Sequence, residues 1–205
     1  MATATQVKAF IEKAAGILAA NADELARLDG QSGDGDLGAS MSAAGQAMRD
    51  MAAATPGEDI GGLLMKVAMA CNKAAPSTMG TLVSSGVMAL AKTSKGKNQL
   101  ADADLIAMPR LFGEAIMARG KAQVGDKTIL DALMPMADAV EAEFAASGDL
   151  GAAFAAGAKA ARAGAEATCG MLAKTGRAKW IGERAQEHMD GGAALCAILA
   201  EGIIA

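Results

Sequence analysis

Apolar residues recur every three to four positions along almost the whole chain, which is typical of helices that bury one face. The first such stripe runs through Val7, Ile11, Ala14 and Leu18, and it ends before Asp29. No run of residues reads as a β-strand, and no repeat of fixed period is present. The pattern therefore predicts an all-α protein with about eight helices.

Capping and turn residues set the limits of the helices in the first half of the chain. A second helix is expected over residues 38–53, and Asp59 is placed to cap a third. Pro76 and Ser77 open a fourth helix, which continues to a polar break at residues 94–98. Each of these helices is long enough to form part of a bundle.

Four further helices are expected in the second half. The fifth ends at a Gly-containing interruption at residues 120–125, after which Asp126 is expected to cap the sixth. An Ala-rich seventh helix runs to about Met171, and an eighth covers residues 191–204. The segment between these two, residues 174–192, has room for a short helix.

The composition agrees with one helical domain over residues 1–205. Hydrophobic residues make up 52% of the chain but aromatic residues only 2%, so the core must consist mainly of small and aliphatic side chains. Helices tolerate this selection better than strands do. The high Ala content predicts close contact between helices. A formal net charge of −4, without a dense Lys/Arg patch, argues against a nucleic-acid-binding surface.

The distribution of cysteines and charges indicates where the protein works. Cys71, Cys169 and Cys196 are odd in number and far apart, which argues against a disulfide framework and for a reducing compartment. Charged residues such as Glu12 near the N-terminus do not fit a signal peptide, and Lys66 interrupts one of the longest apolar stretches. The sequence therefore predicts a soluble, cytoplasmic protein that does not act at a membrane.

The strongest candidate for chemistry is a Gly-rich loop that contains Asp29, Asp34 and Asp36 within eight residues. No Lys, Arg or His lies between Arg27 and Arg49 to neutralise them. Carboxylates this close repel one another unless a cation lies among them, and Mg²⁺ prefers such hard oxygen ligands. The loop predicts a magnesium site, although a solvated acidic turn that caps the next helix is the alternative.

Several common sites are excluded. The single histidine, His188, and the dispersed cysteines argue against zinc and against a Ser-His-Asp hydrolase. An EF-hand loop beginning at Asp34 would need glutamate at the position of Gly45. Residues 120–128 come close to a P-loop, but Asp126 is inserted into the motif and a helix precedes it where a strand is required.

Four other segments suit either a ligand or a purely structural role. Residues 37–40 start a helix whose amides can hold an anion. Residues 77–80 are rich in donors suited to phosphate or ribose, yet they also read as a plain helix start. Gly120 and Gly125 allow a flat ligand to approach closely, or simply separate two helices. Residues 174–184 combine most of the late basic residues with the only tryptophan, or form a solvated connection.

Four motifs occur in a specific order along nearly the whole chain. They are Asp29-x4-Asp34-Gly-Asp36, then Gly125-Asp-Lys-Thr128 with Asp131, then Gly176-Arg-Ala178 followed by Gly182-Glu-Arg184, and finally Asp190-x-Gly192. Together they resemble the nucleotide-binding L subunit of dihydroxyacetone kinase. This resemblance implies a closed barrel of about eight antiparallel amphipathic helices.

The resemblance also implies a site. Asp29, Asp34 and Asp36 would be the catalytic residues and would hold two Mg²⁺ ions that bridge the phosphates of ADP or ATP. The residues that would line the nucleotide are Leu37, Gly38, Ala39, Ser40, Thr78, Met79, Gly80, Gly120, Ile129, Arg177 and Asp190. Among these, the Arg177 guanidinium suits a phosphate clamp.

In the family that the chain resembles, the ketose is held by a separate K-type subunit, which is the implied partner. Two phosphoryl donors remain open. Bound ADP would be rephosphorylated in place by a phosphotransferase-system protein, or ATP would exchange as an ordinary substrate. A homodimer is also left open. The alternative from another class is a regulatory module that senses ADP against ATP and contacts a transcription factor.

Three departures from the family pattern leave the ketose open. Leu37 stands where the family loop commonly has histidine, residues 77–80 replace a Gly-Ser-Ser-Gly turn, and Gly191 replaces a proline. A relative that acts on another short ketose, such as a four-carbon one, fits these changes as well.

Overall fold

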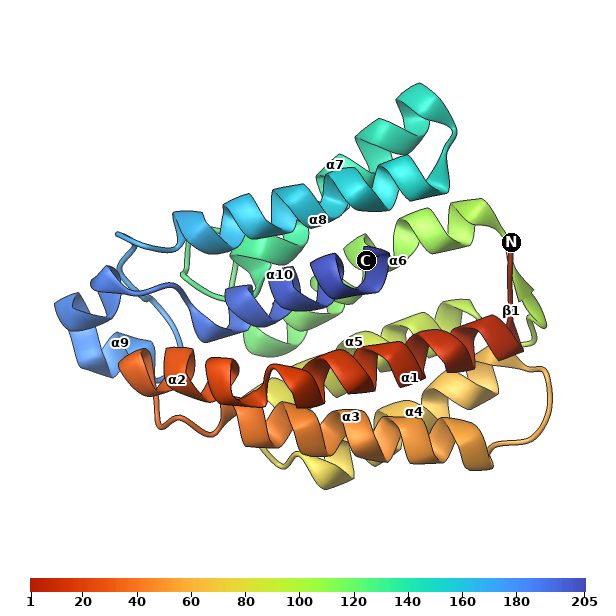
Figure 1. The fold of residues 1–205 in the computed structure, drawn as a ribbon, viewed down its shortest axis with the longest axis horizontal. Coiled ribbons are helices and arrows are strands. Elements are labelled where there is room, and N and C mark those ends of the chain that lie inside the picture. Colours follow the sequence, from red (N-terminus) through yellow and green to blue (C-terminus); the bar gives the residue numbers. More distant parts are fainter.

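The computed structural model describes residues 1–205 and consists almost entirely of helices that lie side by side along one direction (Figure 1). The long helices are α1 (Ala4–Ala20), α2 (Ala22–Ser32), α3 (Leu37–Ala54), α4 (Ile60–Ala74), α5 (Thr78–Thr93), α6 (Asp102–Gly120), α7 (Leu130–Ser147), α8 (Leu150–Ala167) and α10 (Gly191–Ile204). The short elements are α9 (Ala178–Ile181), a 3₁₀ helix (Gly182–Glu187) and two paired strands, β1 (Ala2–Thr3) and β2 (Gln99–Leu100).

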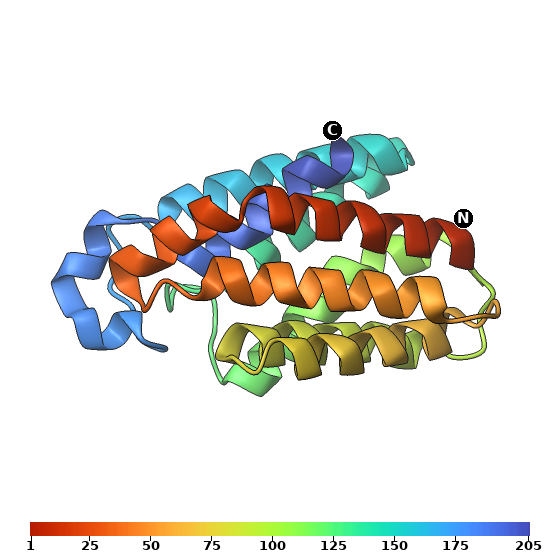
Figure 2. The same ribbon diagram turned by 60° about the horizontal axis from the view of Figure 1, so that its bottom comes forward.

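The long helices form a closed ring. From α3 to α8 each helix packs against the next along the chain, and α10 packs against α8 on one side and against α1 and α2 on the other. Helices α1 and α2 follow each other along one edge and together occupy one position, so the ring has eight positions (Figures 1 and 2). The prediction of an all-α barrel of about eight helices is confirmed.

Small residues allow the helices to approach closely. Ala132, Ala161 and Ala165 are fully buried where α7 meets α8. A side chain at Gly164 of α8 would overlap the carbonyl oxygen of Asp131 on α7. Close contact therefore replaces bulky interdigitation in this core, as the high Ala content predicts.

Some helix limits differ from those predicted. Asp29 lies inside α2 rather than after a helix, because Asn21 ends α1 with its side-chain amide on the Ile17 carbonyl and the chain continues at once as α2. Helix α8 ends at Ala167, four residues before Met171. The helix ends here because the Thr168 hydroxyl donates to the carbonyl of Ala165 in the last turn of α8.

Of the two predicted caps, the one at Asp59 is confirmed and the one at Asp126 is wrong, while the helix start predicted at Pro76 and Ser77 has a cap that was not expected. The Asp59 carboxylate accepts the Gly61 amide, and the Ser77 hydroxyl accepts the Gly80 amide. Asp126 does not cap α7; its carboxylate accepts the amide of Gln123 instead. Strands β1 and β2, which the hydrophobic pattern did not indicate, are two residues each and too short to produce an alternating pattern.

The connections gather at the two ends of the barrel. The α2–α3, α4–α5, α6–α7 and α8–α10 connections lie at the end that contains α9, on the left of Figure 1. The α3–α4, α5–α6 and α7–α8 connections lie at the other end with the N-terminus. None of the helices combines the length and the apolar character needed to cross a bilayer.

Candidate functional site

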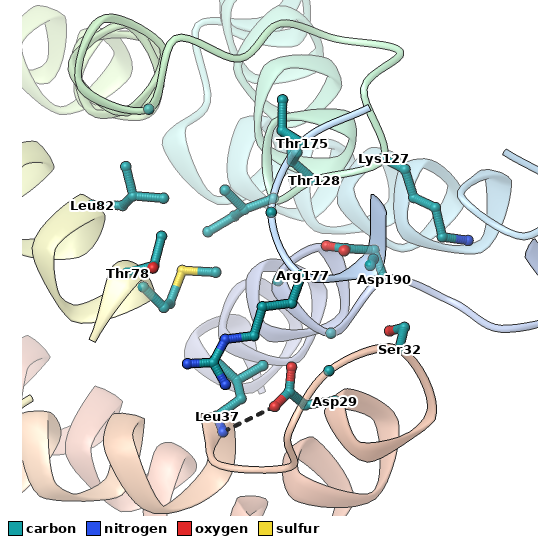
Figure 3. Close-up of a pocket in the computed structure, with 18 of the residues that line it drawn as sticks. Asp29, Ser32, Leu37, Thr78, Leu82, Lys127, Thr128, Thr175, Arg177 and Asp190 are labelled. Carbon is teal, nitrogen blue, oxygen red and sulfur yellow. Dashed lines mark hydrogen bonds between the residues drawn. The ribbon is translucent and has the colours of Figure 1, made fainter. Parts of the chain in front are cut away.

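A cavity of about 230 Å³ opens at the end of the barrel where α9 lies. Its walls come from four connections and the helix ends beside them: residues 29–37, 77–82, 116–130 and 175–192 contribute side chains or backbone (Figure 3). Segments far apart in the sequence meet here because an up-and-down barrel brings every second connection to the same end.

The three predicted aspartates converge at this cavity. Asp29 comes from the last turn of α2, while Asp34 and Asp36 come from the connection to α3. Each offers a carboxylate oxygen, and these oxygens lie within 4.8 Å of one another. Two oxygens bound to one Mg²⁺ lie at most about 4.2 Å apart, twice the ligand distance, so the spread is close to what such an ion requires. The donor set fits Mg²⁺.

Glycines make this convergence possible. A Cβ at Gly33 would lie 2.7 Å from the Asp29 carboxylate, so any larger residue would push the loop away from it. Gly35 has φ of +77°, a left-handed conformation that other residues rarely adopt. The loop thus turns back toward α2, and the Leu37 amide donates to Asp29 Oδ2 at 3.4 Å.

The electrostatics of the loop favour a cation over a simple cap. Asp36 occupies the position before α3, yet its side chain makes no capping hydrogen bond. The only basic side chain paired with the three carboxylates is Arg177, whose guanidinium forms an ion pair with Asp34. One guanidinium against three carboxylates leaves about two negative charges, which a divalent cation would neutralise. The interpretation as a solvated capping turn is therefore disfavoured.

The opposite wall of the cavity is mostly apolar. Thr78 and Leu82 of α5 face the cavity (Figure 3), and Met79 and Ile129 also line it. A Cβ at Gly192 would lie 2.8 Å from the Met79 methyl group, so this glycine makes room for the methionine. A cavity with carboxylates at one side and an apolar wall at the other suits a ligand with a charged end and a flat, less polar end.

Asp190 stands at the start of α10, where its carboxylate accepts the Ala193 amide at 2.8 Å. Burial raises the pKa of Asp190 to about 6, against the opposing effects of the Ala193 amide and the positive charge of Lys127. Its own amide donates to the Thr168 hydroxyl at 2.9 Å. Asp190 is therefore held in place by the backbone of α10 and by the end of α8.

Lys127 is the largest fully buried side chain of the protein, with 1% of its surface exposed. Its ammonium donates to the carbonyl oxygens of Thr168 and His188, each at 2.7 Å. Burial lowers the pKa of Lys127, and the charges of Asp190, Cys169 and Asp131 act in the opposite direction. Two charge-assisted hydrogen bonds, each worth about 1.5–3 kcal/mol, offset the desolvation of the ammonium.

The structure brings ten of the fourteen predicted site residues to the cavity wall. They are Asp29, Asp34, Asp36, Leu37, Thr78, Met79, Gly120, Ile129, Arg177 and Asp190. Gly38, Ala39, Ser40 and Gly80 lie outside the lining. The Ser40 amide donates to the Asp36 carbonyl within α3, and the Gly80 amide is taken by Ser77.

The two glycines outside the lining have packing roles. A side chain at Gly38 would overlap the carbonyl oxygen of Ala22, and one at Gly80 would overlap that of Ala75. Sequence reasoning missed Lys127 as a member of the cavity lining. Its only signal was its place in the segment from Gly125 to Thr128 on which the resemblance partly rests.

A closed helical barrel with a carboxylate cluster at one end of a cavity defines a class of small-ligand-binding helical domains with a candidate metal site. Comparison with known proteins places the chain within this class. Residues 31–205 match the family model described as the DAK2 domain. The chain therefore belongs to the DAK2 domain family.

Individual relatives agree with this assignment. The chain is 27% identical over 189 residues to the "PEP-dependent dihydroxyacetone kinase, ADP-binding subunit DhaL" of Escherichia coli (strain K12), covering 92% of this chain and 90% of that protein. It is 33% identical over 207 residues to the "L-erythrulose kinase" of Pectobacterium atrosepticum, covering all of this chain and 35% of that protein.

Among solved structures, the dihydroxyacetone kinase from C. freundii in complex with AMP-PNP and Mg²⁺ matches with a TM-score of 0.75 and 22% identity. The match covers 98% of this chain and 33% of that one. At this identity the likeness establishes the fold, and it shows that the whole chain has the fold of one part of a longer kinase.

Proposed function

We propose that this chain is the nucleotide- and Mg²⁺-binding subunit of a dihydroxyacetone-type kinase, which transfers a phosphoryl group to a short ketose held by a separate K-type subunit. The proposal rests on one observation above all. Three carboxylates converge within 4.8 Å at one side of a cavity whose other side is apolar. The near end-to-end similarity to an ADP-binding subunit supports the same assignment.

Asp29, Asp34 and Asp36 are the residues that would hold Mg²⁺. Two bound ions would neutralise phosphate charge and polarise the phosphoryl group to be transferred. The aspartates are suited to this role because the fold, rather than the ion, brings them together. Their mutual repulsion raises the affinity of the site for a divalent cation.

The other residues of the cavity bind and orient the nucleotide. The apolar wall around Met79 and Ile129 accepts the base and excludes water from it, while the Arg177 guanidinium offers paired donors to phosphate oxygens. Arg177 pairs with Asp34 in the structure, so a phosphate that enters beside the cations can take over this guanidinium. Asp190 lies on the same wall and suits a polar contact to the ligand.

The acceptor substrate is proposed to come from a partner. The cavity contains no cysteine or histidine side chain among its lining residues, and Lys127 is engaged with two carbonyls. A pair of groups that could capture a ketose covalently is therefore missing from the wall. The relatives include kinases of three- and four-carbon ketoses, and both substrate classes are compatible with this chain.

The direct test is calorimetric titration of the purified chain with ADP and with ATP, each with and without Mg²⁺, after identification of any co-purified nucleotide. Tight Mg²⁺-dependent retention of ADP supports rephosphorylation in place by a phosphotransferase-system protein, whereas freely exchanging ATP supports a conventional kinase. Failure to bind either nucleotide, with the helices intact by circular dichroism, would overturn the proposal.

The regulatory alternative is separated by a second assay. The chain is combined with a K-type subunit, a ketose and the donor identified by the titration, and the phosphorylated ketose is measured. Transfer to dihydroxyacetone or erythrulose supports the kinase. Nucleotide binding without transfer, with every K-type partner offered, points to an ADP/ATP-sensing module.

A further inference from the structure

Lys127 adopts an unusual conformation at an unusual place. Its φ is +60°, in the left-handed region that non-glycine residues seldom occupy, and its side chain is buried. Strained backbone of this kind persists only where surrounding interactions hold it, and it concentrates at functional sites.

The hydrogen bonds of Lys127 join two points that are distant in the sequence. Thr168 and His188 stand at the beginning and near the end of the α8–α10 segment (residues 168–190), and the Lys127 ammonium binds the carbonyl oxygens of both. Neutral hydrogen bonds also join the two arms: the Gly170 amide donates to the Gln186 carbonyl, the Gln186 side chain donates to the Gly170 carbonyl, and the Asp190 amide donates to the Thr168 hydroxyl. Lys127 thus supplies the charge-assisted hydrogen bonds among the polar connections across the base of this segment.

A lysine suits this position better than a neutral donor. Thr168 follows the last residue of α8, and His188 follows the 3₁₀ helix, so both carbonyls belong to helix C-termini, where a positive charge is favourable. The negative charges of Asp190 and Asp131 act to raise the pKa of Lys127 and so favour its ammonium form. The left-handed φ directs the side chain from the α6–α7 connection into the base of the segment.

The α8–α10 segment contributes Arg177 and Asp190 to the cavity. In Figure 3 the Lys127 ammonium lies on the other side of Asp190 from Arg177, apart from the group formed by Asp29 and Leu37, and both of its hydrogen bonds go to carbonyls of the segment. Its ammonium therefore acts on the segment and not on a ligand among the aspartates.

We propose that Lys127 is a positioning residue, which closes the base of the α8–α10 segment and so holds Arg177 and Asp190 against the nucleotide site. The role of these two residues toward nucleotide rests on the proposed function. The closure of the segment itself does not, so the two parts are tested by separate measurements.

The test compares K127M with K121M. Lys121 lies in the same α6–α7 connection and also has a left-handed φ, of +51°, but it is exposed and outside the cavity lining. Methionine keeps the length and apolar stem of lysine while removing the charge and the donors. Each substitution removes one positive charge and one trypsin site from the same connection, so the comparison isolates the buried hydrogen bonds.

Limited trypsin digestion measures the closure of the segment without any ligand. Lys174, Arg177, Lys179 and Arg184 are cleavage sites inside it, whereas cleavage at Arg162 in α8 reports opening of the barrel. K127M is expected to raise the cleavage rate within the segment about tenfold, as expected for the loss of at least one charged hydrogen bond. K121M should stay within about twofold of wild type, as for an ordinary surface substitution.

Two further readouts distinguish positioning from general destabilisation. The anisotropy of Trp180, the only tryptophan, should fall in K127M because the segment gains motion, while cleavage at Arg162 stays unchanged. K127R retains the charge and is expected to recover most of the slow cleavage. If K127M does not fold, K127Q, which keeps amide donors, takes its place in the same comparison.

Calorimetry with ADP and Mg²⁺ then tests the link to the site. The Kd of K127M should rise about tenfold and that of K121M should stay within about twofold. Cleavage and anisotropy like those of wild type would overturn the proposal. An open segment with an unchanged Kd would overturn its link to nucleotide, and a wild-type chain that binds no nucleotide would overturn the proposed function alone.

Discussion

The acidic side chains at the two ends of the barrel differ in the partners that their carboxylates have. At the end opposite the cavity, the aspartates at the starts of helices each have a hydrogen-bond or ion-pair partner in the folded chain. Asp59 accepts the amides of Gly61 and Gly96, Asp149 accepts that of Ala152, and Asp104 pairs with a lysine seven residues earlier. These carboxylates complete the structure, and nothing further is required of them.

At the cavity end, the three carboxylates of the loop, those of Asp29, Asp34 and Asp36, lie around a common space. Asp36 stands before a helix without capping it, and Asp34 has only a distant arginine, Arg177, as its partner. Lys127, which is buried at this end, binds carbonyl oxygens and not the carboxylates of the loop. Three carboxylates that are brought together with a single basic side chain as partner indicate a site for a ligand rather than a device for stability.

The largest expected effect comes from removing the charges of the loop. The double variant D34N/D36N should weaken Mg²⁺-dependent ADP binding by about 100-fold or more, because both residues are proposed to contact the ion directly. D59N, at the opposite end, is the matched control and should leave binding unchanged. Calorimetry with and without Mg²⁺ measures both. Unchanged binding in the double variant would remove the metal assignment.

The arginine of the cavity end should matter next. R177A is expected to weaken ADP binding about 10- to 100-fold, which corresponds to the loss of a charge-assisted contact with phosphate. K179A removes a charge two residues away on the exposed side of α9 and serves as the control. Calorimetric titration with ADP and Mg²⁺ measures both variants. Equal losses of affinity in R177A and K179A would mean that Arg177 contributes only its positive charge and no specific contact.

Glycines with different surroundings should differ in their effect on stability. G38A places a methyl group against the Ala22 carbonyl, where the backbones of α2 and α3 touch, and should lower the free energy of unfolding by about 1–3 kcal/mol. Gly16, inside α1, has open space around it, and G16A should raise that free energy by about 0.5–1 kcal/mol. Urea denaturation measures both. A stabilising G38A would contradict the close approach.

The smallest effect concerns pH, and its sign differs between the two ends. The Lys97 ammonium lowers the pKa of Asp104, so its stabilisation is present above the unfolded pKa of about 4 and is lost as pH falls. Burial raises the pKa of Asp190 to about 6, so its contribution is present below pH 4 and is lost as pH rises through 6.

The corresponding variants should therefore respond oppositely. In metal-free buffer, D104N should lower the melting temperature at pH 7 more than at pH 3. The corresponding loss of unfolding free energy at pH 7 should be that of an exposed ion pair, about 0.2–1 kcal/mol. D190N keeps a residue that caps helices well, and its melting temperature relative to wild type should rise between pH 4 and pH 7. Calorimetric scans across this range measure both. Parallel pH profiles for D190N and wild type would show that Asp190 titrates normally.

Much of the fold could be predicted from local sequence. Helix periodicity, the cap at Asp59 and the helix start at Ser77 depend on residues within a few positions of one another, and these predictions were confirmed. The division between α1 and α2 was missed, because it depends on a single asparagine within a continuous apolar pattern. The cap expected at Asp126 was wrong, since Asp131 accepts the amides of both Gly125 and Thr128 and thereby orders that turn.

The candidate site likewise has one part that depends on residues close in sequence and another that depends on distant residues. Asp29, Asp34 and Asp36 lie within eight residues, and the glycines between them leave the backbone free to turn the carboxylates toward one point, so the sequence by itself determined that they could meet. It could not determine what faces them. Arg177 lies 143 positions after Asp34, and Lys127 lies 41 and 61 positions before the carbonyls that it binds. Only the closure of the barrel brings such partners together, because contacts at this separation depend on the packing of every helix between them.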